Sequence, residues 1–186
     1  MEGFVDWLAW LAAAGPPLAL VGACIAAGTA VLVWVRTTRE PLHEALDRSL
    51  RDAAVAAALA LILVLTFRSA IPTDGYDRLR LVPFEDILDG TLAPELRVRA
   101  AVDVVGNLLV FVPIGAALAA RFSGWSPVGL VAGVVVLAIA VEAAQLALNI
   151  GRTADVTDVL VEPAGALLGF WVWRSFARPR PRTASA

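Results

Sequence analysis

Carboxylate and amide side chains recur at helical spacing in three otherwise apolar stretches of the chain. Members of each set are three, four or seven residues apart, which places them on one face of a helix. The sets are Asp103 with Asn107, then Glu142 with Gln145 and Asn149, and finally Asp155 with Asp158 and Glu162. Carboxylates grouped in this way could act as general acid and base or bind a divalent cation through oxygen atoms.

Arg152 lies in the short connection between the second and third sets. A guanidinium binds a carboxylate or a phosphate through two parallel hydrogen bonds. Arg152 could therefore hold an anionic ligand, or it could close an ion pair with Asp155 or Asp158. Two other structural roles stay open: Asp155 could cap the helix that follows it, and Gln145 could form an interhelical hydrogen bond.

Catalysis by a nucleophile paired with histidine is disfavoured. The only histidine, His43, is expected in an earlier connection beside Glu44, on the opposite side of a membrane from the polar sets. A Ser-His or Cys-His pair is central to a catalytic triad, so the sequence argues against acyl transfer by that route. The single cysteine, Cys24, permits neither an internal disulfide nor a cysteine-based metal cluster.

The elements that must position these residues are membrane helices. Of the 186 residues, 59% are hydrophobic and 17% are charged, and the mean hydropathy is +0.76. A soluble domain of this size could not bury so much apolar surface, which excludes a disordered chain and a conventional cytosolic enzyme. The net charge of −2 supplies no basic field, so no nucleic-acid partner is expected.

Five apolar runs are long enough to cross a bilayer, which takes about 20 residues per helix. They cover residues 16–35, 53–71, 104–122, 127–148 and 156–176. Since lipid offers no hydrogen-bond partner to an open backbone, each run must be helical. The sequence therefore predicts an all-α, polytopic membrane helical bundle of about five transmembrane helices. It is expected to form a single integral membrane domain over residues 1–186, with a basic flexible tail at 177–186.

The arginines predict the orientation of the bundle. With the N-terminus outside, nine of the fifteen arginines lie inside and six lie outside, as expected because short cytoplasmic loops accumulate arginine. The last three spans then alternate in direction, so the three polar sets share one membrane level, the outer leaflet. We therefore expect a polar pocket that opens to the outside, and a cytoplasmic C-terminus.

The connection of about residues 72–103 is predicted to be ordered in pieces. Residues 84–88 could form a short helix that lies on the membrane or packs back onto the bundle. Residues 93–103 are expected to be helical, and Pro94 suits their first turn. In the spans themselves, Gly129 with Gly133 and Gly165 with Gly169 are expected to permit close helix packing.

Over about residues 59–173 the sequence resembles the VanZ-like family of bacterial membrane proteins. The resemblance rests on a Leu-Val-Pro-Phe loop at residues 81–84 and an Asn-x-x-x-Phe-x-Pro-x-Gly helix at residues 107–115. An ordered series of polar and glycine positions follows, namely Glu142, Gln145, Arg152, Asp155, Asp158, Gly165 and Gly169. The chain differs at two positions: the family usually has Asn where Glu162 stands, and commonly Thr where Pro163 stands. The extra carboxylate of Glu162 changes the charge expected of the pocket.

The resemblance implies a multi-pass protein of the bacterial cell membrane. It carries over functional positions at Asn107, Glu142, Gln145, Arg152, Asp155 and Asp158. A named member of the family is linked to resistance to glycopeptide antibiotics, teicoplanin above all, which implies a role at the cell envelope. No enzymatic activity comes with the resemblance.

The leading functional hypothesis is a pocket that binds an anionic lipid-linked or amphiphilic ligand from the outer face. Besides membrane lipids, the expected ligands are a lipid-linked cell-wall precursor or a lipophilic glycopeptide. The expected lining is Asn107, Glu142, Gln145, Arg152, Asp155, Asp158 and Glu162, and no cofactor is expected. Two alternatives remain: a membrane enzyme that uses carboxylates as acid and base on a lipid or polyprenyl phosphate, and a structural or assembly protein whose polar residues only lock the bundle.

Overall fold

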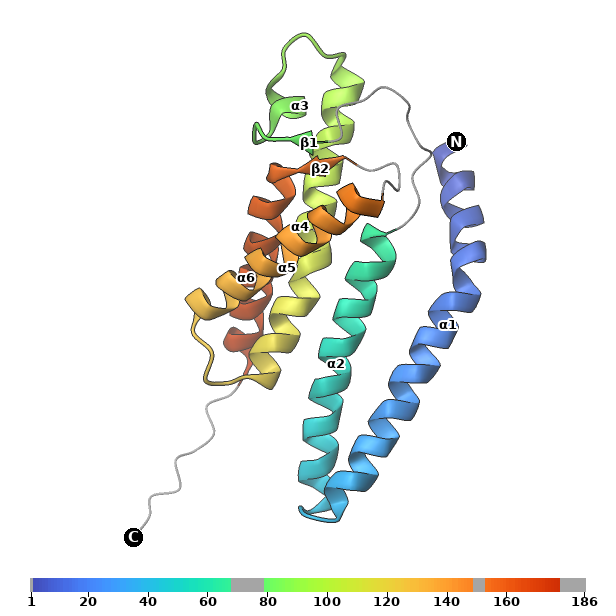
Figure 1. Ribbon diagram of the computed structural model, residues 1–186, viewed down its shortest axis with the longest axis vertical. Coiled ribbons are helices and arrows are strands. Elements are labelled where there is room, and N and C mark those ends of the chain that lie inside the picture. Colours follow the sequence, from blue (N-terminus) through green and yellow to red (C-terminus); the bar gives the residue numbers. More distant parts are fainter. Residues whose placement is uncertain (1, 68–78, 149–152, 178–186) are drawn as a thin grey trace. The chain divides into compact units, whose positions relative to one another are not determined.

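The computed structural model describes residues 2–67, 79–148 and 153–177, with the backbone alone described for residues 2–18. The described chain is almost entirely helical (Figure 1). In chain order the elements are α1 (Glu2–Thr37), α2 (Leu42–Thr66), β1 (Leu79–Arg80), α3 (Glu85–Leu88), α4 (Pro94–Arg121), α5 (Pro127–Leu148), β2 (Ala154–Asp155) and α6 (Val156–Phe176).

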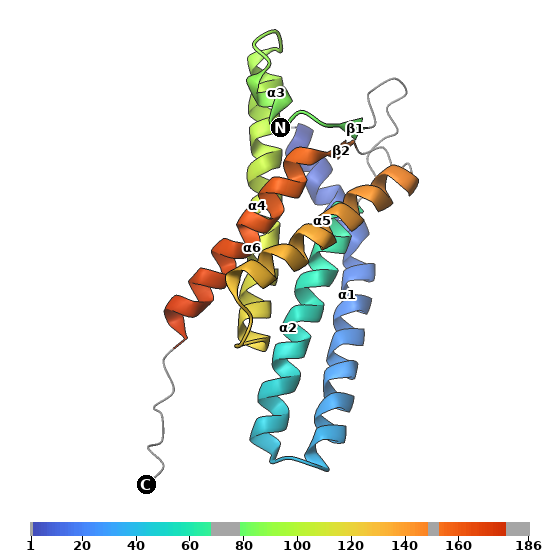
Figure 2. The same ribbon diagram turned by 60° about the vertical axis from the view of Figure 1, so that its left-hand side comes forward.

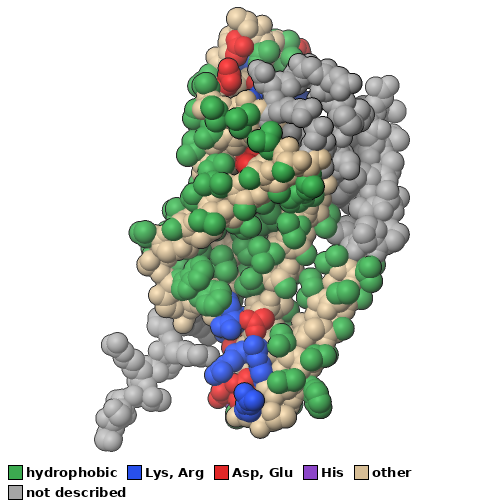
Figure 3. Space-filling model, in the orientation of Figure 1, with side chains coloured by type: hydrophobic (Ala, Val, Ile, Leu, Met, Phe, Trp, Pro, Cys, Tyr) green, Lys and Arg blue, Asp and Glu red, His purple; other side chains and the backbone are tan. Residues whose placement is uncertain are grey.

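Five helices in the described part of the chain are long and apolar enough to cross a membrane: α1 from Ala19 onward, α2, α4, α5 and α6. The predicted all-α architecture with about five spans is therefore confirmed. Large apolar side chains such as Leu109, Val128 and Val136 are exposed, which a lipid solvent accommodates. On the face shown in Figure 3, hydrophobic side chains are spread over the described helices, and the charged side chains that are visible lie mainly toward the two ends of the view.

Three helices extend beyond the apolar runs that predicted them, and the first of these is α1, which begins at Glu2 where residue 16 was expected. The third span was expected from residue 104, but α4 begins ten residues earlier at Pro94 and continues without a break. Pro94 stands in the first turn, where its missing N–H costs no helical hydrogen bond. Likewise α2 begins at Leu42 with a polar segment and ends at Thr66, short of the predicted residue 71.

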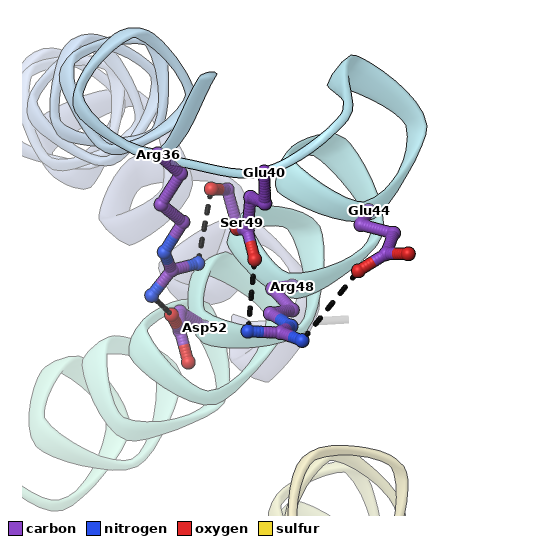
Figure 4. A network of polar contacts seen from close by, with 6 residues as sticks. All are labelled: Arg36, Glu40, Glu44, Arg48, Ser49 and Asp52. Carbon is purple, nitrogen blue, oxygen red and sulfur yellow. Dashed lines mark hydrogen bonds and ion pairs between the residues drawn. The ribbon is translucent and has the colours of Figure 1, made fainter. Parts of the chain in front are cut away.

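The chain divides into two compact units, residues 1–60 and 61–186. The first unit holds α1 and most of α2. Near the turn that joins them, Arg36 Nη2 lies 2.6 Å from Asp52 Oδ2, and Arg36 Nη1 donates to Ser49 Oγ at 3.0 Å. Arg48 Nη1 lies 2.8 Å from Glu40 Oε2 in the same network (Figure 4). Because these contacts join residues on both sides of the turn, they hold the two helix ends together.

The second unit is built on close packing of α4 against α6. A Cβ atom added to Gly115 would overlap the carbonyl oxygen of Ala166, and one added to Gly165 or Gly169 would overlap backbone oxygens of α4. The expectation for Gly165 and Gly169 is thus confirmed. That for Gly129 and Gly133 is wrong, because an added Cβ at Gly133 meets no described atom within 4 Å, and one at Gly129 meets only its own turn.

The core of this unit contains bulky apolar residues from all three of its long helices. Phe111 and Ile114 of α4, Leu130 of α5 and Phe170 of α6 are almost completely buried. The helix α5 packs mainly on α6. A two-residue parallel pairing of β1 with β2, with Leu79 opposite Ala154, lies beside the start of α6 (Figures 1 and 2). Strands this short carry no periodic signal, so the sequence did not predict them.

Candidate ligand pocket

The polar sets of α4 and α6 meet directly. Asn107 Nδ2 donates a hydrogen bond of 2.5 Å to Asp158 Oδ1. The two residues are 51 positions apart, and the contact of Gly165, two turns further along α6, with the backbone of Leu108 sets the spacing of their helices. An amide donating to a carboxylate is a charge-assisted hydrogen bond, stronger than one between neutral groups. This contact fixes the orientation of both side chains at the start of the α4–α6 interface.

The polar set of α5 reaches the same region. Glu142 Oε2 accepts a 2.8 Å hydrogen bond from the backbone N–H of Asp155. Carboxylate oxygens of Glu142, Asp158 and Glu162 all lie within 4.8 Å of one another. Glu142 is 7% exposed and Glu162 is 1% exposed. By donor type, the three carboxylates could hold a hard cation such as Mg²⁺ or Ca²⁺, both of which take oxygen ligands.

Two of the predicted site residues have clear structural partners. Gln145, only 2% exposed, donates from Nε2 to the carbonyl oxygen of Thr66 at 3.0 Å, at the end of α2. Asp155 caps α6, since its Oδ1 accepts from the backbone N–H of Thr157 at 2.7 Å. Both structural roles left open by the sequence are therefore confirmed, and a further contact of Asp155 with a ligand stays a prediction.

A cavity of about 470 Å³ opens above these contacts in the second unit. Its lining is mixed. The apolar part consists of Leu65, Phe84, Ile87, Ala100 and Val104, and the charged part consists of Arg80, Glu85, Asp86, Asp103, Asp155 and Asp158. Asn107, Thr153 and Thr157 complete the wall. Of the seven residues predicted to line a pocket, Asn107, Asp155 and Asp158 do so in the structure.

The other four predicted residues do not appear in this lining. Glu142, Gln145 and Glu162 are buried among the helices and support the wall from behind through the contacts already described. Arg152 falls outside the described residues, as do Asn149 and the tail from residue 178 onward. The proposal that Arg152 contacts a ligand therefore stays a prediction.

One side of the cavity is formed by a segment that we call the strap, residues 79–88, which contains β1 and α3. Arg80 pairs with Asp86 inside the strap. The backbone N–H of Phe84 donates to Thr157 Oγ1 at 3.0 Å, and Arg97 Nε donates to the carbonyl of Ile87 at 3.1 Å. The strap is thus tied to both α6 and α4. The short helix at residues 85–88 packs onto the bundle, the second of the two predicted placements.

The residues that flank α3, Phe84 before it and Asp89 after it, both have distinctive local structure. Phe84 has a φ of 58°, a left-handed conformation that is uncommon for a bulky residue. The N–H of the same residue donates to the hydroxyl of the buried Thr157. At the other end, the hydroxyl and then the backbone N–H of Thr91 donate to the Asp89 carboxylate, and these bonds hold the pKa of Asp89 below its usual value.

The family model described as VanZ/LLP1 matches residues 54–177, about two thirds of the chain. The chain belongs to the VanZ/LLP1 family. It is a multi-pass membrane protein with about five spans. No curated protein and no solved structure matches the chain.

The whole cavity lies in the VanZ/LLP1 region, from Leu65 at the end of α2 to Asp158 in α6. The helix α1 precedes that region. Sequence reasoning missed the strap residues Arg80, Glu85 and Asp86 as pocket lining. The one available signal was the Leu-Val-Pro-Phe motif, whose Phe84 anchors the strap to α6.

Proposed function

We propose that this VanZ/LLP1 protein binds the polar headgroup of a lipid-linked amphiphile in the cavity between α4, α6 and the strap. The observation that carries the proposal is the mixed lining of a cavity built into a membrane protein. Small-molecule sites occupy about 300–1,000 Å³ and combine apolar walls with a few convergent polar groups. At about 470 Å³ this cavity falls within that range, and its lining of five apolar and nine polar or charged residues supplies both kinds of surface, with the polar residues in the majority.

The apolar lining residues would contact the hydrocarbon chain of the ligand, and the polar lining residues would contact its headgroup. Leu65, Ala100 and Val104 supply apolar surface for the first carbons of an acyl or prenyl chain. Asn107 and Asp158, held together at 2.5 Å, present a rigid polar pair to the headgroup. A pre-oriented polar pair gives up less conformational entropy on binding than a mobile one, which favours affinity.

The cellular role follows from the family resemblance and is proposed on that basis. The ligand belongs to the cell envelope, as a lipid-linked wall precursor or a lipophilic glycopeptide such as teicoplanin would. With the N-terminus outside, the cavity faces the outer leaflet, where such molecules meet the membrane. Binding there changes how the precursor or the drug meets the membrane.

A second candidate function is supported by Asp158. This residue belongs both to the cavity wall and to the carboxylate group that includes Glu142 and Glu162. An acid and a base in contact with a bound lipid are the minimum for general acid-base catalysis. Conversion of an envelope lipid extract by the purified protein, abolished by Glu142→Gln in a folded variant, would favour this enzyme over a binding protein.

The binding proposal is tested by filling the cavity. Ala100→Trp places a large ring in the wall, and Val98→Trp is the matched control, since Val98 is on the same helix, exposed and outside the lining. Native mass spectrometry of protein purified in mild detergent should show a retained lipid in wild type and Val98→Trp. Its occupancy should fall by about tenfold in Ala100→Trp, which corresponds to about 1.4 kcal/mol of lost binding energy.

Thermal unfolding of all three proteins provides the check on folding, and the milder Ala100→Leu serves if the tryptophan variant does not fold. An Ala100→Trp protein that melts like wild type and retains the same lipid at the same occupancy would overturn the proposal.

A further inference from the structure

The charge of the cavity restricts the chemistry of its ligand. The described lining carries five carboxylates and one guanidinium, a formal net charge of −4. The sequence segments 68–78 and 149–152, which lie outside the described residues, hold three arginines and two aspartates, so adding all of these charges to the total would still leave −3. A purely anionic headgroup would enter this field against repulsion.

Two of the carboxylates are available at the rim. Glu85 of the strap and Asp103 of α4 are exposed, and within the described residues neither side chain takes part in a hydrogen bond or ion pair. The others are engaged: Asp86 with Arg80, Asp155 with the Thr157 N–H, and Asp158 with Asn107. Glu85 and Asp103 therefore offer carboxylate oxygens from two different walls of one cavity.

We propose that the cavity selects a headgroup bearing a primary ammonium, which Glu85 and Asp103 bind at the rim. An ammonium brings the positive charge that the lining lacks, and its three N–H donors match carboxylate acceptors on two walls. A sugar hydroxyl would donate to the same oxygens but leave the excess negative charge uncompensated. The phosphate of a zwitterionic headgroup would approach Arg80, the one cation among the described lining residues, which also pairs with Asp86.

This inference rests on the proposed function, because it names the ligand class of the same cavity. The probes are phosphatidylethanolamine, with a primary ammonium, and phosphatidylglycerol, which is anionic, both with the same acyl chains. They compete at equal concentration for the purified wild-type protein, and native mass spectrometry measures the ratio of bound lipids. We expect phosphatidylethanolamine to be favoured by about fivefold, the effect of two ion pairs at exposed positions.

Variants of the rim carboxylates test whether these residues cause the preference for phosphatidylethanolamine. The double variant Glu85→Gln with Asp103→Asn should reduce the preference to less than about twofold, because both rim charges are gone. Glu95→Gln removes one carboxylate from an exposed position on α4 outside the cavity, so it should keep the wild-type ratio. Equal binding of the two lipids to wild type, or an unchanged preference in the double variant, would overturn the ammonium assignment.

A metal ion is the other source of positive charge. The competition is therefore repeated with EDTA and with added calcium chloride. If calcium makes phosphatidylglycerol the preferred lipid and EDTA abolishes that preference, the charge is met by a cation and the ammonium assignment fails. Failure of the proposed function looks different: neither lipid would show binding that Ala100→Trp removes.

Discussion

At the scale of single residues, burial separates polar side chains that the sequence presents alike. Asn107 and Gln145 are both amides within apolar spans, yet one lines the cavity and the other is 2% exposed between helices. Gln145 satisfies the carbonyl of Thr66, which lies in the last turn of α2, where helical carbonyls have no partner within the helix. Its role is therefore to hold the end of α2 against α5.

Replacing Gln145 by Leu should destabilise the protein by about 1 kcal/mol. Interhelical hydrogen bonds in membrane proteins average about 0.6 kcal/mol and reach about 1.7, and here the buried acceptor is left unsatisfied. Reversible unfolding in detergent measures the change. Thr66→Val is the matched control, because it removes the hydroxyl and keeps the carbonyl, so a larger loss in the control than in Gln145→Leu would contradict this account.

At the scale of elements, the approach of α4 to α6 positions the cavity wall. Backbone atoms of one helix lie against Gly165 and Gly169 of the other, with no room for a side chain. Leu108, whose carbonyl faces Gly165, directly follows Asn107. The distance between the helix backbones thus determines whether Asn107 reaches Asp158 at 2.5 Å. The interface between α4 and α6 therefore determines both the packing of the two helices and the position of the polar pair in the cavity wall.

Gly165→Ala should cost about 1–3 kcal/mol, the usual range for overpacking, because the new methyl group overlaps a backbone carbonyl that cannot rotate away. Gly106→Ala is the control on α4, where an added Cβ meets no described atom within 4 Å. That variant should melt at or slightly above the wild-type temperature, since alanine favours helix over glycine. Similar melting temperatures for the two variants would show that the helices are not in close contact at Gly165.

At the scale of the whole molecule, orientation decides which membrane face the cavity serves. The positive-inside rule puts nine arginines in the cytoplasm when the N-terminus is outside. The connection between α1 and α2 is then cytoplasmic, and the segment between α3 and α4 is outside. Access for an envelope ligand depends on this arrangement.

Orientation can be tested by labelling single cysteines in a Cys24→Ala background, since Cys24 is the only native cysteine. In intact cells, a maleimide that cannot cross the membrane should label Thr91→Cys, which precedes α4 and is exposed. It should label Thr38→Cys, in the turn after α1, only after permeabilisation. The reverse pattern would place the cavity on the cytoplasmic side and remove the proposed encounter with outer-leaflet ligands.

The sequence by itself determined that the long elements are helices and how many of them there are. Five apolar runs of about 20 residues admit no other regular state in lipid, because every backbone group must find its partner within the segment. Helical spacing also placed Asp155 and Asp158 on a common face with Glu162. Family motifs placed the resemblance at about residues 59–173, and the VanZ/LLP1 model matches residues 54–177.

Only the tertiary structure decided which polar residues line the cavity and which support it from behind. Periodicity says which residues share a helix face, but the direction of that face depends on how neighbouring helices pack. Glu142, Gln145 and Glu162 therefore turned out buried, while Asn107 and Asp158 reached the cavity. The strap contributes Arg80 and Glu85 through contacts between residues more than 70 positions apart, such as Phe84 with Thr157, and no local pattern encodes a pairing over that separation.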